Sequence, residues 1–201
     1  MYQCSSNLEK DDTAPTMVIT ASQGATGFTS SDAALSLTFT SSEATTTFAV
    51  GDISVSNCAL SAFNADSSTV YTATCTATAD GATTIDVAGS TFTDAVGNNN
   101  TAATQFNWSY DSTAPTMVIT SAEVSDGGAS SDGNLSLTFT SNEATTNFTV
   151  GDITVTNGTI SNFASTSSTV YTATFTPTTT GATTIDVAAA TFTDASGNNN
   201  I

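Results

Sequence analysis

Acidic side chains are the residues of this sequence whose chemistry stands out. Asp and Glu account for 18 of the 201 residues, Lys10 is the only basic residue, and there is no His. Without His there is no Ser-His-Asp or Cys-His pair for nucleophilic catalysis, and without Arg there is no clamp for a phosphoryl group. Paired carboxylates can hydrolyse glycosides, but here they fall in turns of a small repeated module with no obvious cleft. We therefore expect a protein that is not an enzyme.

The net charge of −17 restricts the partners of the chain. Nucleic acids and anionic membrane surfaces need clustered Lys or Arg, which the sequence does not have. No stretch approaches the eighteen or more apolar residues of a membrane span. An acidic surface instead suits an extracellular location and divalent cations, which bind carboxylate and carbonyl oxygens.

The chain is a tandem repeat with an offset of 100 residues. Thr113–Thr120 repeats Thr13–Thr20 residue for residue, and the correspondence continues without a gap to residue 200. Such self-similarity marks an array of equivalent structural units. We expect one domain over residues 11–110, a second over 111–201, and a separate N-terminal segment over 1–10.

Within each copy, apolar residues alternate with Thr and Ser, the period of a half-buried β-strand. The first copy shows this pattern at Leu35–Thr40, Val70–Ala77, Thr83–Val87 and Gln105–Tyr110. Turn residues such as Gly, Asn and Asp separate the strands. The pattern predicts an all-β protein: two tandem immunoglobulin-like antiparallel β-sandwich domains of about seven strands each.

Three motifs also resemble a known family. They are the opening Asp11–Pro15, the central Phe48–Asn57 and the closing Thr91–Asn98, all repeated in the second copy. Together they resemble the bacterial Ig-like repeats of large extracellular surface adhesins. The resemblance implies a structural or adhesive module at the cell surface, next to other copies of the same module. It also implies calcium between modules that stiffens the array. A cell-surface glycan or protein is a further candidate partner.

The acidic residues that an Ig-like fold would bring together are candidate calcium ligands. The end of the sandwich at which the chain enters also carries several loops, so carboxylates from the opening motif and from two loops should meet there. Two interpretations of these residues stay open. They form a calcium site built from hard oxygen ligands, or they are solvated turn residues whose side chains form hydrogen bonds with their own backbone. The candidates are Asp11, Asp12, Glu43 and Asp94 in the first copy, and Asp111, Glu143 and Asp194 in the second, with Asp80 expected near the junction.

Cys58 and Cys75 occur only in the first copy; Gly158 and Phe175 take their places in the second. Their segments read as a hairpin, and pairing residues whose numbers sum to 133 places the two cysteines opposite each other. We therefore predict a Cys58–Cys75 disulfide. The same register would place Phe175 over Gly158.

The second copy has no counterpart of the last strand, Gln105–Tyr110. An Ig-like sandwich without that strand exposes a groove that suits strand addition. One interpretation is that the chain is an excerpt of a longer array. Another is a self-assembling extracellular filament, in which residues 1–10 of one molecule fill the groove of the next. A carbohydrate-binding module is a third hypothesis.

Overall fold

The computed structural model describes residues 10–201; the predicted role of residues 1–10 as a strand therefore lies almost entirely outside the described residues. The chain divides into two compact units, one that ends at Asp111 and one that spans Ser112–Ile201.

Unit 1 contains eight strands among its described residues. They are β1 (Met17–Ala21), β2 (Phe28–Ser30), β3 (Ala34–Ser41), β4 (Ile53–Ser56), β5 (Cys58–Ala65), β6 (Val70–Ala77), β7 (Gly81–Val87) and β8 (Phe106–Tyr110). The alternation of small hydroxyl and branched apolar residues favours this extended, pleated backbone.

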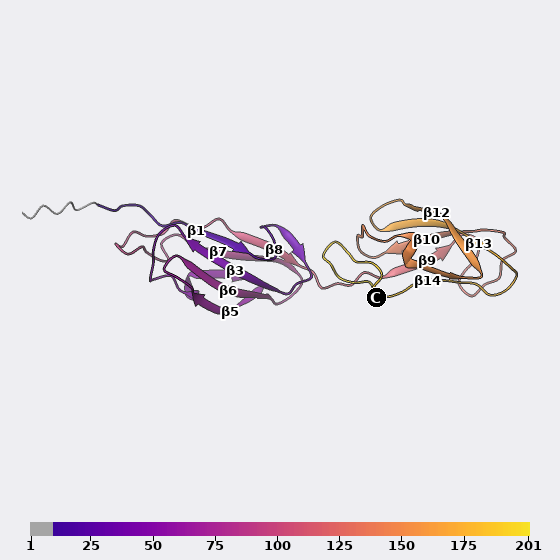
Figure 1. The fold of residues 1–201 in the computed structure, drawn as a ribbon, viewed down its shortest axis with the longest axis horizontal. Coiled ribbons are helices and arrows are strands. Elements are labelled where there is room, and N and C mark those ends of the chain that lie inside the picture. Colours follow the sequence, from indigo (N-terminus) through magenta and orange to yellow (C-terminus); the bar gives the residue numbers. More distant parts are fainter. Residues whose placement is uncertain (1–9) are drawn as a thin grey trace, which may run out of the picture. The chain divides into compact units, whose positions relative to one another are not determined.

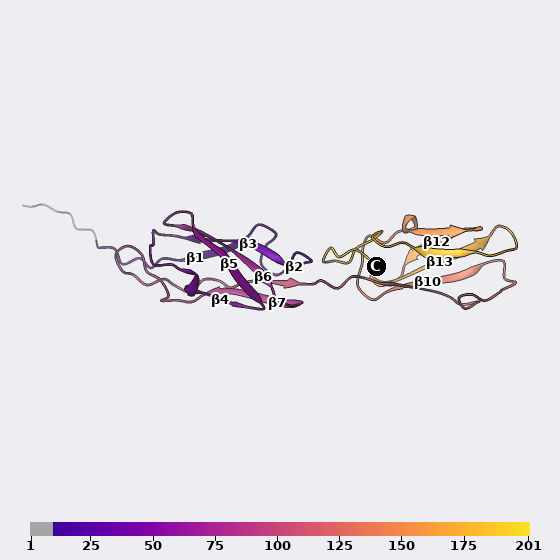
Figure 2. The same cartoon turned by 90° about the horizontal axis from the view of Figure 1, so that it is seen from below.

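The strands of unit 1 form two four-stranded sheets, seen as separate layers in Figure 2. One sheet has the order β1-β3-β6-β5, and the other has the order β2-β8-β7-β4. All pairs are antiparallel except β2 with β8, which run parallel. This arrangement is that of an immunoglobulin-like sandwich.

Aromatic side chains fill the core of unit 1 between the two sheets. Phe48 lies at the centre of one group, and its ring packs 4.9 Å from Tyr71 and 5.2 Å from Phe92. The Tyr71 hydroxyl donates a hydrogen bond of 2.7 Å to the backbone carbonyl of Thr45, which satisfies its polar end inside the core. Unit 2 repeats this group around Phe148.

Unit 2, all of whose residues the structure describes, contains six strands. They are β9 (Met117–Ser121), β10 (Leu135–Ser141), β11 (Ile153–Thr156), β12 (Gly158–Ser165), β13 (Val170–Pro177) and β14 (Thr184–Val187) (Figure 1). One sheet keeps the order β12-β13-β10-β9, but the second has only β11-β14. Residues 112–201 contain no strand that corresponds to β2 or β8, which pair with each other in unit 1.

The all-β, Ig-like prediction is thus confirmed, with eight strands in unit 1 and six in unit 2. The predicted register of the cysteine hairpin is wrong by two residues. Cys58 lies opposite Ala77, and Cys75 lies opposite Leu60. Beside the turn Ala65 lies opposite Tyr71, so the pairing there already differs from the prediction by three residues; the bulge between Ser61 and Asn64 adds one residue to β5 and reduces the difference to two. A shift of two preserves the face on which each side chain lies, so the cysteines still meet, as diagonal neighbours.

Candidate calcium sites and an open groove

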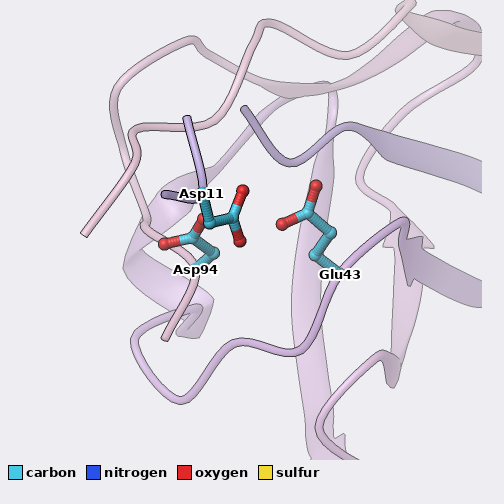
Figure 3. A group of neighbouring side chains, drawn as sticks. All are labelled: Asp11, Glu43 and Asp94. Carbon is cyan, nitrogen blue, oxygen red and sulfur yellow. The ribbon is translucent and has the colours of Figure 1, made fainter. Parts of the chain in front are cut away.

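The N-terminal pole of each unit, the end at which the chain enters its sandwich, gathers three carboxylates. In unit 1 these are Asp11, Glu43 and Asp94, whose nearest oxygens all lie within 4.8 Å of one another (Figure 3). They come from three separate segments: the opening motif, the loop after β3, and the loop between β7 and β8. The fold therefore builds the cluster from residues up to 83 positions apart in the sequence.

Asp94 is held rigidly by its own loop. Its Oδ1 accepts the backbone N–H groups of Val96, Gly97 and Asn98 at 3.0, 2.7 and 2.8 Å. Its Oδ2 accepts the side-chain amide of Asn98 at 2.7 Å. Burial raises the pKa of Asp94, but the hydrogen bonds from Asn98, Gly97 and Val96 outweigh it and hold the pKa below its ordinary value. This carboxylate stays charged.

Asp11 and Glu43 complete the cluster. Their carboxylates take no part in the hydrogen bonds by which Asp94 holds its own loop. Asp11 accepts the backbone N–H of Thr13 at 3.0 Å, and its own carbonyl accepts the Asn98 amide at 3.3 Å. Burial, together with the negative charges of Asp11 and Asp94, raises the pKa of Glu43 above its ordinary value. The rise means that the charged form of Glu43 is disfavoured beside the other two carboxylates.

The second copy places Asp111, Glu143 and Asp194 in the equivalent cluster, within the same 4.8 Å limit. Asp194 Oδ1 accepts the backbone N–H groups of Ser196 and Asn198, each at 2.8 Å. Burial raises the pKa of Asp194, but hydrogen bonds from Asn198 and Glu143 outweigh it and lower the pKa. The arrangement is therefore a repeated feature of the fold.

Two of the predicted carboxylates lie outside the clusters. Asp12 forms an exposed ion pair with Lys10, with 3.0 Å between Nζ and Oδ2, and is not one of the three clustered carboxylates. Asp80 lies in the exposed turn between β6 and β7 and belongs to neither cluster. The predicted site at the junction of the two copies stays a prediction.

Asn98 and Asn100 support the first cluster, and the sequence reading did not single them out. Asn98 links the Asp94 carboxylate to the Asp11 carbonyl. Buried Asn100 accepts the backbone N–H groups of Thr91 and Phe92 and donates to the carbonyl of Ala88, which fixes the base of the loop. The run of three asparagines at 98–100 recurs at 198–200, and this repetition is the feature of the sequence that could have identified them.

The donor set of each cluster fits a hard cation. Calcium takes six to eight oxygen ligands at about 2.3–2.6 Å, from carboxylates, backbone carbonyls and water. Zinc and copper prefer imidazole or thiolate, and neither group occurs in the clusters. Lys10, the only basic side chain of the sequence, pairs with Asp12 instead of neutralising the site.

The disulfide of unit 1 joins Cys58 on β5 to Cys75 on β6, with 5.8 Å between their Cα atoms. Cys75 is fully buried, so the bridge is part of the core. In unit 2 a Cβ atom placed on Gly158 would overlap the ring of Phe175. Glycine at 158 therefore makes room for the phenylalanine ring that replaces the bridge.

A second feature is a groove of 1660 Å³ in unit 2, where β8 would lie. Apolar side chains line its floor, among them Leu135 and Ile185, both partly exposed. Their counterparts Leu35 and Ile85 in unit 1 are 0% exposed. None of the three clustered carboxylates of unit 2 lines this groove.

Unit 1 fills the equivalent space with its own β8. Trp108 is 2% exposed and stacks on Phe28, with 6.0 Å between ring centroids. It is a core residue, as the sequence indicated, and presents no surface on which a sugar could stack. Phe106 is also buried, against Ile85 of β7.

The sandwich fold, and the carboxylate cluster repeated at the N-terminal pole of both units, define the chain as a tandem immunoglobulin-like protein. The family model for the bacterial Ig-like domain matches residues 11–110 and again residues 111–201. The chain belongs to this family, as its motifs suggested.

Among solved structures, the chain is similar to Yersinia pseudotuberculosis InvD at 19% sequence identity and a TM-score of 0.38. That match covers 95% of this chain and 57% of the other. A search of curated proteins finds no match. Among residues 10–201, no helix is long and apolar enough to cross a membrane.

Proposed function

We propose that this chain is a non-catalytic structural or adhesive stretch of an extracellular bacterial surface protein, and that each of its two N-terminal poles binds a calcium ion. Membership of the bacterial Ig-like domain family supports the structural role. The absence of His and Arg from the sequence removes the usual nucleophilic and phosphoryl-transfer chemistries.

The observation that carries the calcium proposal is the repetition of one carboxylate cluster at equivalent positions of both copies. Turn chemistry alone accounts for Asp94, which caps its own loop. It does not account for Glu43, which brings a third carboxylate to the same place and has a pKa raised by burial and by the charges of Asp11 and Asp94. A divalent cation would remove this repulsion and join three segments of the sandwich.

Calcium binding would then stabilise each unit only where the ion is abundant, as it is outside cells. In unit 1 the bound ion would hold together the opening segment at Asp11, the loop after β3 and the loop between β7 and β8. Extracellular calcium modules bind with dissociation constants of about 0.1–1 mM. At about 10 mM calcium such a site adds roughly 1.5–3 kcal/mol to the stability of its unit.

The test is the stability of unit 1 in the full chain with Glu43→Gln. Trp108 is the only tryptophan and lies in the core of unit 1, so its fluorescence during urea unfolding reports that unit alone. Without calcium the substitution should stabilise unit 1, because it removes a repelled charge. With about 10 mM calcium the order should reverse, because a ligand is lost.

Asp12→Asn is the matched control, since it removes a nearby charge that lies outside the cluster. Its effect should be the same with and without calcium. If wild type and Glu43→Gln respond equally to calcium, the N-terminal pole of unit 1 is not a calcium site.

A further inference from the structure

Asn157 lies where β11 ends and β12 begins, and it is the only asparagine of the sequence that is followed by glycine. We propose that Asn157 is a site of spontaneous deamidation, and that its conversion releases the turn between β13 and β14. The inference concerns the covalent chemistry of unit 2 and is independent of calcium binding.

Deamidation at this position needs only water as a reactant. The backbone nitrogen of Gly158 loses its proton and attacks the side-chain carbonyl carbon of Asn157, so that a C–N bond forms and the amide nitrogen leaves as ammonia. Water then opens the resulting succinimide ring at either of its carbonyl carbons, which gives aspartate or isoaspartate. A Cβ atom on the following residue hinders the attack, and glycine has none. Among the asparagines of this chain, the reaction therefore favours Asn157.

The core of unit 2 requires the glycine that makes this reaction easy. Phe175 of β13 is 1% exposed, and a Cβ atom on residue 158 would overlap its ring. Unit 1 has the disulfide at the corresponding positions, so Asn57, the counterpart of Asn157, is followed by Cys58. The replacement of the bridge by a phenylalanine ring thus places glycine directly after Asn157.

The side chain of Asn157 holds the turn that follows β13. Its Nδ2 donates to the carbonyls of Thr179 and Ala182, at 2.9 and 3.4 Å. Its Oδ1 accepts the backbone N–H of Thr179 at 3.2 Å and the hydroxyl of the same residue at 2.7 Å. The amide therefore joins the connection between β11 and β12 to this turn through both its donor and its acceptor.

Conversion would break this junction. An ionised carboxylate has no N–H to donate, and its oxygens would face the carbonyl oxygens of Thr179 and Ala182. Isoaspartate also adds a methylene group to the main chain, which would displace Gly158 from its place beside the ring of Phe175. Both products should therefore release the turn and destabilise unit 2.

The same hydrogen bonds control the rate of the reaction. Asn157 is partly exposed, so water reaches it, but its side chain must leave Thr179 before the nitrogen of Gly158 can attack. Thr179→Val removes the hydrogen bond from the hydroxyl and should raise the rate about two- to tenfold. An unchanged rate would overturn the coupling between the reaction and the turn.

The test follows each asparagine of the full chain by peptide mapping with mass spectrometry, during incubation at mildly alkaline pH. In the wild type, Asn157 should convert at least about tenfold faster than Asn57. Gly158→Cys together with Phe175→Cys gives unit 2 the residue pair of unit 1, and should slow the conversion of Asn157 at least about tenfold.

The reciprocal exchange is made in unit 1. Cys58→Gly together with Cys75→Phe should make Asn57 convert at least about tenfold faster than in the wild type. Cys58→Ala together with Cys75→Ala is the matched control, because it removes the bridge but keeps a Cβ atom after Asn57. In that variant Asn57 should convert as slowly as in the wild type.

The consequence for the fold is measured on the converted chain, which anion exchange separates by its additional negative charge. In calorimetry its unit 2 transition should fall by about 4 °C or more, whereas the Trp108 transition of unit 1 should not change. The site is overturned if the folded chain keeps Asn157 intact over the time in which the denatured chain converts it, or if the exchanges leave both rates unchanged. An unchanged unit 2 transition in the converted chain overturns the release of the turn.

Discussion

Reduction of the Cys58–Cys75 disulfide should destabilise unit 1 and leave unit 2 unaffected. The bridge closes a loop with a sequence separation of 17 residues. In the chain-entropy model a loop of this length contributes about 3 kcal/mol, by restricting the unfolded chain. With a urea dependence of about 1–3 kcal/mol per molar, the unfolding midpoint should fall by about 1–3 M.

Unit 2 supplies the variant that separates the bridge from the packing around it. Cys58→Gly combined with Cys75→Phe gives unit 1 the pair found at Gly158 and Phe175, and should fold with a filled core. Cys75→Phe alone leaves a Cβ atom at position 58 that overlaps the new ring. Overpacking of this kind costs about 1–3 kcal/mol, so the single variant should be less stable than the double variant.

Trp108 fluorescence in the full chain is the assay for all of these forms, since it reports unit 1 alone. Two results would refute the reasoning. One is a midpoint that does not change on reduction. The other is a Cys75→Phe variant as stable as the double variant, which would mean that position 58 does not face the ring.

Two further predictions concern buried and surface hydrogen bonds. Tyr71→Phe removes the hydrogen bond to the Thr45 carbonyl and should lower the free energy of unfolding of unit 1 by about 1–3 kcal/mol. Tyr171→Phe removes the equivalent bond in unit 2 and should leave the unfolding transition of Trp108 unchanged. Equal shifts of that transition would contradict the separation of the two units. Glu123 accepts the Ser136 N–H at 2.7 Å, and hydrogen bonds from Ser136 and Ser121 lower its pKa from 4.5 to about 2. Because the folded pKa is depressed, its stabilisation is complete above pH 4.5 and is lost as the pH falls towards 2. Glu123→Gln, which installs the residue of the first copy, should therefore destabilise unit 2 at pH 7 but match wild type near pH 2 in calorimetry; a difference that does not depend on pH would show that the charge has no role.

The sequence predicted the fold well because the signals for it are local and repeated. Alternation of Leu, Phe and Thr over Leu35–Thr40 specifies a strand with one buried face, and β3 spans that segment. The offset of 100 residues then assigns β1 and β3–β7 a counterpart in unit 2, whereas no residue of the sequence aligns with β8.

The sequence could not predict features that depend on irregular backbone. The turn of the cysteine hairpin and the bulge after Ser61 together set its register, and the bulge places Ala62, a residue type that does not favour it, at a positive φ of 50°. Asp11 and Asp12 are adjacent and chemically alike, but an extended chain points successive side chains in different directions, so only one can join Glu43 and Asp94. The supporting role of Asn98 depends on the turn that it closes.

The number of calcium ions bound per chain tests the central claim most directly. Equilibrium dialysis against calcium up to several millimolar should find two ions per wild-type chain, one in Glu43→Gln, one in Glu143→Gln and none in the double variant. Asp12→Asn should still bind two. A wild-type chain that binds no calcium at these concentrations, or variants that bind as many ions as wild type, would contradict the assignment of the two N-terminal poles as calcium sites.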